Sequence, residues 1–195
     1  MVNNLPAESK DFFLFLNIIC MKKFQIAIIW SAWAEEYPEW SLEFEKLYEM
    51  SYQAWYLLAE EWCFVLTGGK SGIMLWASKW CRDGWGMSIG FVKWSHRFVS
   101  NEYVDIEIVT NMWDGWDAFL IPYSADGAIV IGGGVGTLKE IAWFYLQWKP
   151  IIILEKTGWW AEKLKDQYLD ERNIIKTMSA NTPKEAVEIL LVKLL

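Results

Sequence analysis

Cysteine, histidine and basic side chains are scarce in this sequence, and each shortage argues against a class of protein. The chain of 195 residues contains three cysteines and one histidine. Cys20, Cys63 and Cys81 are scattered and form no Cys-x-x-Cys pair, which argues against a disulfide framework and against a structural zinc site. We therefore expect a cytoplasmic protein without a bound metal.

The charge balance and the short hydrophobic runs exclude two further kinds of partner. Lys and Arg total 18 against 25 Asp and Glu, which gives a formal net charge of -7. No basic stripe is present to hold a phosphate backbone, so we expect no nucleic-acid partner. The apolar run at residues 12–20 is much shorter than the about twenty residues that cross a bilayer. We expect no membrane partner.

Residues 1–23 are expected to form an N-terminal extension. One Lys against two acidic residues precedes the apolar run, and no small-residue cleavage site follows it, which argues against a signal peptide. The segment lies either outside the fold or on its surface as a short helix. Residues 24–195 are long enough for a substantial core and too short for two ordinary α/β domains, so we expect a single domain there.

One stretch, residues 129–140, organises the chain. Its sequence IVIGGGVGTLKE combines a buried strand, four glycines within five residues, and the start of a helical pattern. Glycine lets the backbone approach a ligand closely, and the first N–H groups of a helix have no partner within the helix. A phosphate or carboxylate binds readily at such a junction. The alternative is a tight strand-to-helix connection without a ligand.

A second glycine-rich loop follows another predicted strand, at residues 63–66. The sequence TGGKSG at residues 67–72 leads into a helix, but its spacing departs from the Walker pattern and does not indicate ATP hydrolysis. Ligands of parallel α/β sheets bind beyond the carboxyl ends of the strands. Both loops are expected at that edge.

Strands and helices alternate along the whole chain, which predicts an α/β fold of three layers with a mainly parallel sheet. The organising stretch supplies one strand, at residues 128–131, and a helix that follows it. The other predicted strands are residues 25–29, 63–66, 86–92, 104–109, 150–154 and 173–178. The other predicted helices are residues 42–60, a helix beginning at 73, residues 118–123 and 160–170, and a last helix that opens at Thr182 with a capping box and a proline.

The motifs resemble those of the Lonely Guy and lysine-decarboxylase-like superfamily, and within it the molybdenum-cofactor carrier-like branch. GGGVGTLKE resembles the superfamily motif PGGxGTxxE, with Gly132 in place of proline, and TGGKSGIM resembles its second glycine loop. NEYVDIEIVT, SADGAIVIGG, QWKPIIIL and TGWW resemble the carrier-like branch. The resemblance implies a Rossmann-like fold, a nucleotide or molybdenum cofactor as ligand, and a homodimer or higher homo-oligomer.

The resemblance also bears on catalysis. Lonely Guy enzymes are nucleoside 5'-monophosphate phosphoribohydrolases that cleave an N-glycosidic bond with an arginine and the final glutamate of the motif. The glutamate is present as Glu140, but Asp117 occupies the position that matches the arginine. A carboxylate cannot neutralise a phosphate as arginine does. We therefore expect a carrier-like protein that is non-catalytic or weakly catalytic; the alternatives are a phosphoribohydrolase that uses Glu140 and a fold retained only as an interaction scaffold.

The candidate ligand-binding residues come from the two glycine loops. Thr137 and Glu140 have the alternative roles of starting the helix and favouring its dipole. A metal trio of Asp114, Asp117 and Asp126 is disfavoured, because Asp126 precedes its strand. The predicted ligand-binding residues are Gly68, Gly69, Lys70, Ser71, Gly72, Gly132, Gly133, Gly134, Val135, Gly136 and Thr137.

Tryptophan is abnormally abundant, with 15 residues against 13 glycines. Proteins of the superfamily have glycine at the positions of several of these tryptophans, and glycine and tryptophan codons such as GGG and TGG differ by one base. We infer glycine-to-tryptophan replacements that are either deliberate or an artefact of sequencing or translation. Large rings in the first loop are expected to narrow the ligand pocket. The positions are Trp30, Trp33, Trp55, Trp62, Trp80, Trp85, Trp148 and Trp159.

Overall fold

A computed structural model of the chain describes residues 23–30, 42–70, 73–112 and 117–195. Residues 1–22 of the N-terminal extension, Trp33, Ser71, Gly72 and Asp114 lie outside these ranges. The strands are β1 (Gln25–Trp30), β2 (Phe64–Thr67), β3 (Met87–Val92), β4 (Ile106–Val109), β5 (Gly127–Ile131), β6 (Ile151–Leu154) and β7 (Met178–Ala180). The helices are α2 (Leu42–Glu60), α3 (Ile73–Asp83), α4 (Asp117–Ser124), α5 (Val135–Leu146), α6 (Trp159–Leu164) and α7 (Pro183–Leu194).

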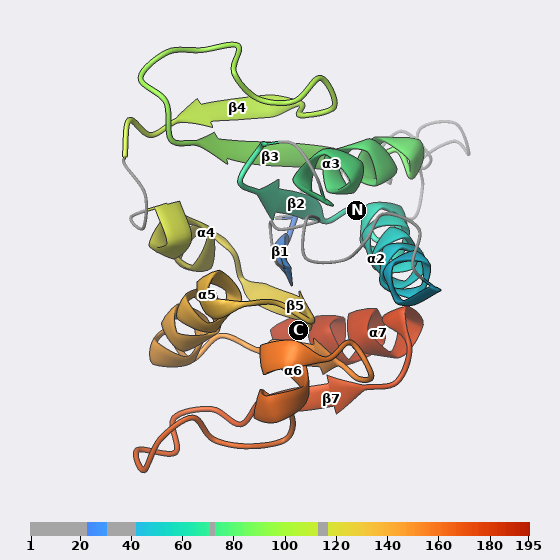
Figure 1. Cartoon of the computed structure of the whole chain (residues 1–195), viewed down its shortest axis with the longest axis vertical. Coiled ribbons are helices and arrows are strands. Elements are labelled where there is room, and N and C mark those ends of the chain that lie inside the picture. Colours follow the sequence, from blue (N-terminus) through green and yellow to red (C-terminus); the bar gives the residue numbers. More distant parts are fainter. Residues whose placement is uncertain (1–22, 31–41, 71–72, 113–116) are drawn as a thin grey trace, which may run out of the picture.

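The strands form one seven-stranded sheet in the order β4-β3-β2-β1-β5-β6-β7 (Figure 1). All six neighbouring pairs are parallel. β1 lies at the centre between β2 and β5, and the chain builds the sheet outward from it in both directions. The three-layer, parallel α/β fold expected from the alternation of elements is confirmed, and it is of the Rossmann-like type.

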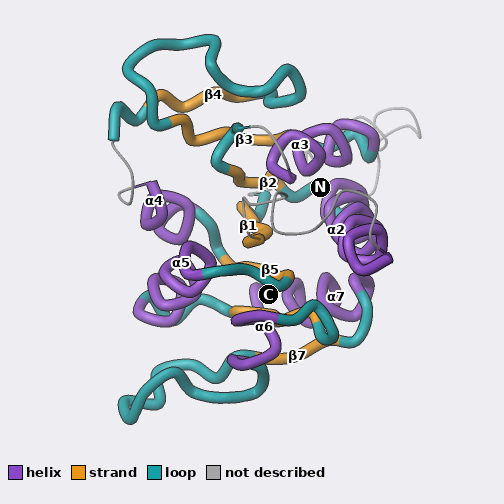
Figure 2. Tube along the Cα trace, viewed as in Figure 1, coloured by secondary structure: helices purple, strands orange, loops and turns teal. Residues whose placement is uncertain are grey.

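Helices cover both faces of the sheet (Figure 2). Residues of the central strands alternate between the two faces, because successive side chains of a strand point in opposite directions. Ile26 and Ile28 of β1 pack with residues of α2, α3 and α7, whereas Ala27 and Ile29 pack with residues of α4, α5 and α6. The apolar runs of the sequence are therefore buried on both sides, as a central parallel strand requires.

The end of the chain departs from the prediction in two places. The helix expected over residues 160–170 ends at Leu164, because Lys165 is extended (φ -69°, ψ 141°) and Asp166 has φ 52°. The strand expected over residues 173–178 begins only at Met178. The Asp166 carboxylate accepts hydrogen bonds from the N–H of Ser179 (3.0 Å) and from its hydroxyl (2.5 Å). This side chain stabilises a turn where the apolar spacing predicts a helix.

The last helix begins as predicted. Thr182 is the N-cap, and its hydroxyl accepts a hydrogen bond from the N–H of Glu185 (3.2 Å), with Pro183 in the first turn. The Glu185 carboxylate accepts from the N–H of Asn181 (2.7 Å), one residue before the position of a standard capping box. Among the described residues, no helix combines the length and hydrophobicity needed to cross a membrane.

Candidate functional site

The two glycine-rich loops lie at the same edge of the sheet. One follows the carboxyl end of β2 and the other follows the carboxyl end of β5, and β1 separates these two strands. The carboxyl ends of parallel strands meet at one edge, which is where this fold binds its ligands. Trp30, expected in the first strand-to-helix loop, is instead the last residue of β1. Asp126 lies at the opposite edge, where its carboxylate accepts from the N–H of Gln25 (2.8 Å).

The loop after β5 has a backbone that requires glycine. Gly132 and Gly133 have φ values of 58° and 94°, in the region that residues with a side chain rarely adopt. A Cβ atom on Gly132 would lie 2.9 Å from the carbonyl oxygen of Thr157, and one on Gly133 would overlap the side chain of Thr137. The loop therefore depends on glycine both for its conformation and for its close packing.

A buried threonine holds this loop. The Thr157 hydroxyl accepts a hydrogen bond from the N–H of Gly132 (2.9 Å) and donates one to the carbonyl of Leu154 (2.7 Å). The carbonyls of Gly132 and Gly133 accept from N–H groups at the start of α6. Gly132 therefore shapes the loop through bonds within the protein, and its N–H is already used.

The start of α5 is open. Its N-cap is Gly134, which has no side chain to satisfy the first N–H groups of the helix. Val135 is 64% exposed, and a Cβ atom on Gly136 would meet nothing within 4 Å. Thr137 is only 2% exposed, and among the described residues its hydroxyl has no hydrogen-bond partner. Uncapped N–H groups and the positive end of the helix dipole thus lie at an open surface, with the unpartnered Thr137 hydroxyl buried directly beneath it.

The loop after β2 is closed more tightly. Gly69 has φ 65°, and its N–H donates to the Thr67 hydroxyl (2.8 Å). A Cβ atom on Gly69 would lie 3.2 Å from the backbone of Gly90 in β3. Asn101 forms two hydrogen bonds with this loop. Its backbone N–H donates to the carbonyl of Gly69 (2.9 Å), and its side-chain Nδ2 donates to the carbonyl of Lys70 (2.9 Å). This loop is positioned by β3 and by the segment that follows it.

A carboxylate of β4 organises that segment. Glu107 accepts hydrogen bonds from the N–H groups of Phe98 (2.7 Å), Val99 (2.9 Å) and Ser100 (2.8 Å). Desolvation alone would raise the pKa of Glu107, but these bonds outweigh it and hold the pKa below its usual value. The sequence patterns assign no role to Thr157, Asn101 or Glu107. The only signal is that they fall in stretches that resemble the carrier-like branch, Thr157 in TGWW and the other two in NEYVDIEIVT.

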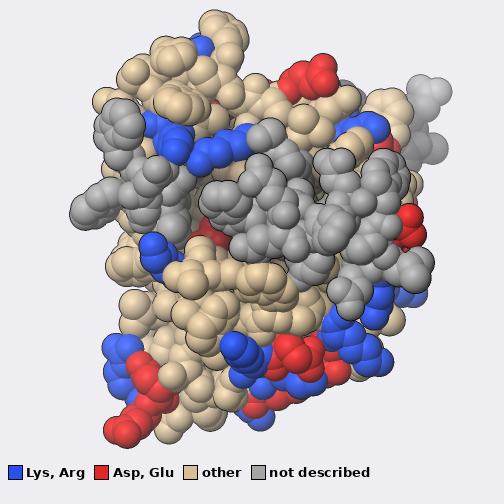
Figure 3. Space-filling view, viewed as in Figure 1, with Lys and Arg blue, Asp and Glu red and all other residues tan. Residues whose placement is uncertain are grey.

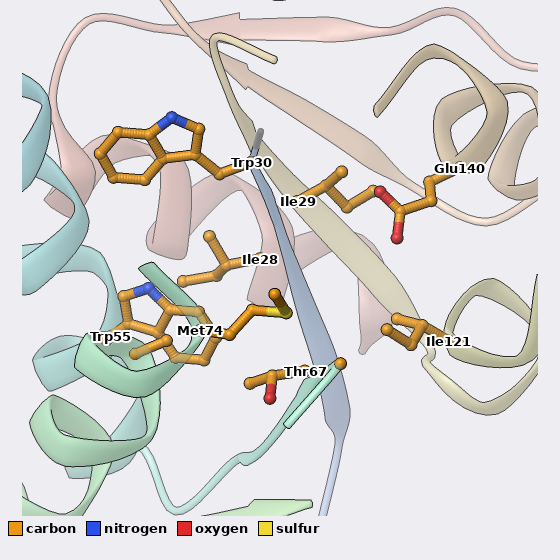
Figure 4. A pocket seen from close by; sticks show the side chains of 10 residues that line it. Ile28, Ile29, Trp30, Trp55, Thr67, Met74, Ile121 and Glu140 are labelled. Atoms are coloured by element: carbon orange, nitrogen blue, oxygen red, sulfur yellow. The ribbon is translucent and has the colours of Figure 1, made fainter. Parts of the chain in front are cut away.

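A small cavity lies between the loop after β2 and helix α5, which follows the other loop (Figure 4). Its volume is about 60 Å³, and Thr67 and Gly68 from one loop and Glu140 from α5 contribute to its lining. Figure 4 shows the indole rings of Trp30 and Trp55 on the same side of β1 as Ile28, with Glu140 across the strand. The remaining lining residues are Ile28, Ile29, Met74, Ala77 and Ile121.

The surface charges are mixed in the view of Figure 3. A short row of basic side chains crosses the upper part of this face, and basic and acidic side chains alternate along its lower part. Within the described ranges, no group of three or more His, Cys, Asp and Glu side chains is arranged to hold a metal ion.

The arrangement defines a class of protein: a Rossmann-like α/β protein with glycine-rich strand-to-helix turns at the carboxyl edge of a parallel sheet. The chain belongs to the SLOG cluster4 family, whose model matches residues 25–187. This result confirms the resemblance to the Lonely Guy superfamily.

Individual relatives agree with this assignment. An uncharacterized protein of Archaeoglobus fulgidus is 30% identical over 98 residues; the match covers 50% of this chain and 64% of that protein, less than two thirds of its length. The crystal structure of the structural-genomics protein TM1055 superposes with a TM-score of 0.75 at 26% identity, covering 88% of this chain and 99% of that one. A molybdenum cofactor binding protein from Rippkaea orientalis has a TM-score of 0.71 at 25% identity, covering 90% and 99%.

Proposed function

We propose that the protein binds a phosphate-bearing nucleotide or molybdopterin-type ligand at the carboxyl edge of its sheet, as a carrier without catalysis of its own. The observation that carries the proposal is the open start of α5, where the buried Thr137 hydroxyl has no partner among the described residues. An unpaired buried hydroxyl costs free energy unless a ligand satisfies it. Similarity to the molybdenum cofactor binding protein of Rippkaea orientalis supports a ligand of this chemistry.

The anionic group is assigned to the N–H groups of Val135, Gly136 and Thr137. These are the first three positions of α5, and the helix dipole favours negative charge there. The proposal includes the remaining glycine-loop residues as second contacts, through Gly68, Gly69 and Lys70. Ser71 and Gly72 belong to the same proposed site but lie outside the described residues.

Thr137→Val tests this proposal, because valine keeps the shape of threonine and removes only the hydroxyl. We expect binding of adenosine 5'-monophosphate or molybdopterin, measured by titration calorimetry, to weaken by about ten- to hundredfold, since a hydrogen bond to a charged group contributes about 1.5–3 kcal/mol. Stability should not fall, because the hydroxyl has no hydrogen-bond partner among the described residues. Unchanged affinity in the variant would contradict the assignment.

A phosphoribohydrolase is the second candidate, favoured by one observation: Glu140 lines the cavity between the loop after β2 and α5. A carboxylate there is placed to act on a bound sugar, but the position that matches the family arginine is Asp117. Incubation with adenosine 5'-monophosphate and chromatography for free adenine decides between the candidates. Release of adenine that disappears in Glu140→Gln would establish the enzyme, whereas binding without release supports the carrier.

A further inference from the structure

The cavity between the loop after β2 and α5 is too small to hold the heterocyclic ring of the proposed ligand. Ligand pockets commonly have volumes of about 300–1,000 Å³. The observed volume of about 60 Å³ has room for only a few water molecules. The start of α5 can receive an anionic group from outside, but the cavity cannot admit a heterocyclic ring as well.

Two indole rings occupy the space beside this cavity. Trp30 ends β1 and is half-buried, and Trp55 of α2 is 2% exposed. Both line the cavity from the side covered by α2 and α3 (Figure 4). Among the described residues, the Trp55 ring nitrogen is buried without a hydrogen-bond partner. A buried donor without an acceptor is unfavourable, so polar contacts do not explain why this ring is there.

We propose that Trp30 and Trp55 limit how much of the ligand the cavity admits, and that removing their rings lets the heterocyclic ring of a nucleotide enter while its phosphate stays at the start of α5. This inference rests on the proposed function, since it concerns the same site. Truncation of Trp55 breaks no hydrogen bond of its ring within the described structure. The space released is continuous with the existing cavity, because both rings line it.

The test compares inorganic phosphate with adenosine 5'-monophosphate by titration calorimetry. The proteins are the unmodified chain, Trp30→Gly, and the double variant Trp30→Gly/Trp55→Ala. We expect the affinity for the nucleotide to rise by about tenfold or more in the variants, while the affinity for phosphate stays the same. Trp85→Gly is the matched control, because it removes an indole at the amino end of β3, at the opposite edge of the sheet.

The outcomes separate the two proposals. Retained phosphate binding with no gain for the nucleotide in either variant overturns the role of the tryptophans and leaves the proposed function intact. Absence of phosphate binding in every protein overturns the proposed function. Circular dichroism and thermal unfolding confirm that each variant folds, and Trp30→Ala replaces Trp30→Gly if the glycine variant does not.

A second inference comes from the helix ends, which are independent of the cavity. Trp62, Trp85 and Trp148 follow α2, α3 and α5 and have φ values of 58°, 60° and 62°. The N–H of each tryptophan donates to the carbonyl three residues earlier, at 3.0, 3.0 and 3.1 Å. The N–H of the next residue donates to the carbonyl five residues before it, at 3.0, 2.8 and 3.2 Å. These paired bonds make three Schellman motifs with tryptophan at the left-handed position.

Glycine is the usual residue at that position, since a Cβ atom is unfavourable at positive φ. The indole rings gain little in return, because Trp62, Trp85 and Trp148 are 57%, 92% and 68% exposed. Three helices end in the same Schellman motif with tryptophan at the position that favours glycine. This repetition indicates that the three tryptophans have a common origin. We infer that this fold is built for glycine at positions 62, 85 and 148, and that the protein made by its own cells carries glycine there.

Each of Trp62→Gly, Trp85→Gly and Trp148→Gly is expected to raise the thermal unfolding midpoint by about 2–4 °C, with Trp85→Gly gaining most because its ring is most exposed. Trp94→Gly is the control: its ring is 45% exposed, and its φ is not positive. An intact mass below 22.8 kDa for the protein from its own cells supports the inference. A mass of 22.8 kDa without a gain in any of the three variants overturns it.

Discussion

The two edges of the sheet differ in whether the polar groups at their helix ends are hydrogen-bonded within the protein. At the amino edge, where helices return to strands, three Schellman motifs satisfy the last carbonyls of α2, α3 and α5. The ammonium group of Lys149 also donates to the carbonyls of Pro122 (2.6 Å) and Tyr123 (2.9 Å) at the end of α4. At the carboxyl edge, α5 begins on Gly134 without a side-chain cap, and the Thr137 hydroxyl is unpaired within the described structure.

This difference is what the proposed function requires of an edge that binds a ligand and of one that serves stability. Polar groups that are satisfied inside the protein have nothing to offer a ligand, whereas unsatisfied groups at an open surface do. The carboxyl edge does contain satisfied groups, such as the N–H of Gly132 and that of Gly69, and these fix the loops. Rigid loops thus present a few free donors, which is the arrangement a preorganised binding site requires.

The largest expected effect is at the carboxyl edge. Gly133→Ala should lower the free energy of unfolding by about 2–4 kcal/mol, because Gly133 has φ 94° and a Cβ atom would overlap Thr137. Urea unfolding measures the loss. Gly136→Ala is the matched control: it should not destabilise the protein, since the space there is open, but it should weaken phosphate binding. Equal stability of the two variants would refute the structural requirement at Gly133.

A smaller effect is expected at the amino edge. Lys149→Met removes a donor shared by two carbonyls of α4 and keeps the aliphatic stem. Unfolding in urea should show a loss of about 1–3 kcal/mol, whereas phosphate binding should be unchanged because Lys149 follows the opposite end of α5 from the proposed anion site. If Lys149→Met changed phosphate binding as much as Gly136→Ala does, the two edges would not differ in their contribution to binding.

The smallest expected effect is on the stability of the protein at low pH. Asp170 lies close to the amino edge, where it accepts from the Tyr145 hydroxyl near the end of α5 (2.7 Å). The Arg172 guanidinium and then this hydroxyl lower the pKa of Asp170 from 3.8 to about 2. Because the folded pKa is below the unfolded one, this contribution to stability is complete above pH 3.8 and is lost as the pH falls through about 2.

Urea unfolding between pH 5 and pH 2 measures this contribution. Tyr145→Phe should reduce the dependence of stability on pH in that range, since one of the bonds to Asp170 is removed. The phenylalanine keeps the buried ring of Tyr145 in the core. An unchanged pH dependence in this variant would show that the hydroxyl does not contribute to the low pKa.

Much of this fold follows from the sequence alone. The apolar runs predict every strand of the sheet except for the position of the last, because buried parallel strands are continuous hydrophobic stretches. The helix at residues 42–60 has the predicted bounds. The failure at residues 165–178 has a local cause, since the side chains of Asp166 and Thr177 bind backbone groups there. Hydrogen bonds of this kind depend on tertiary position and leave no periodic signal.

The candidate site is only partly predictable. Glycine spacing locates both loops, but the sequence cannot tell which N–H groups are already used. Gly132 donates to Thr157, 25 residues away, and only the fold brings the two together. In the same way, comparison with the superfamily motifs identifies the unusual tryptophans, but only the structure shows that Trp62, Trp85 and Trp148 have positive φ.

The position of β1 between β2 and β5 sets the distance between the two glycine loops. Neighbouring strands are about 4.8 Å apart, so the strands that end in the two glycine loops, with β1 between them, are separated by roughly 10 Å. A bare phosphate is shorter than this distance and reaches one loop at a time. A molecule that contacts both loops has to span about that distance.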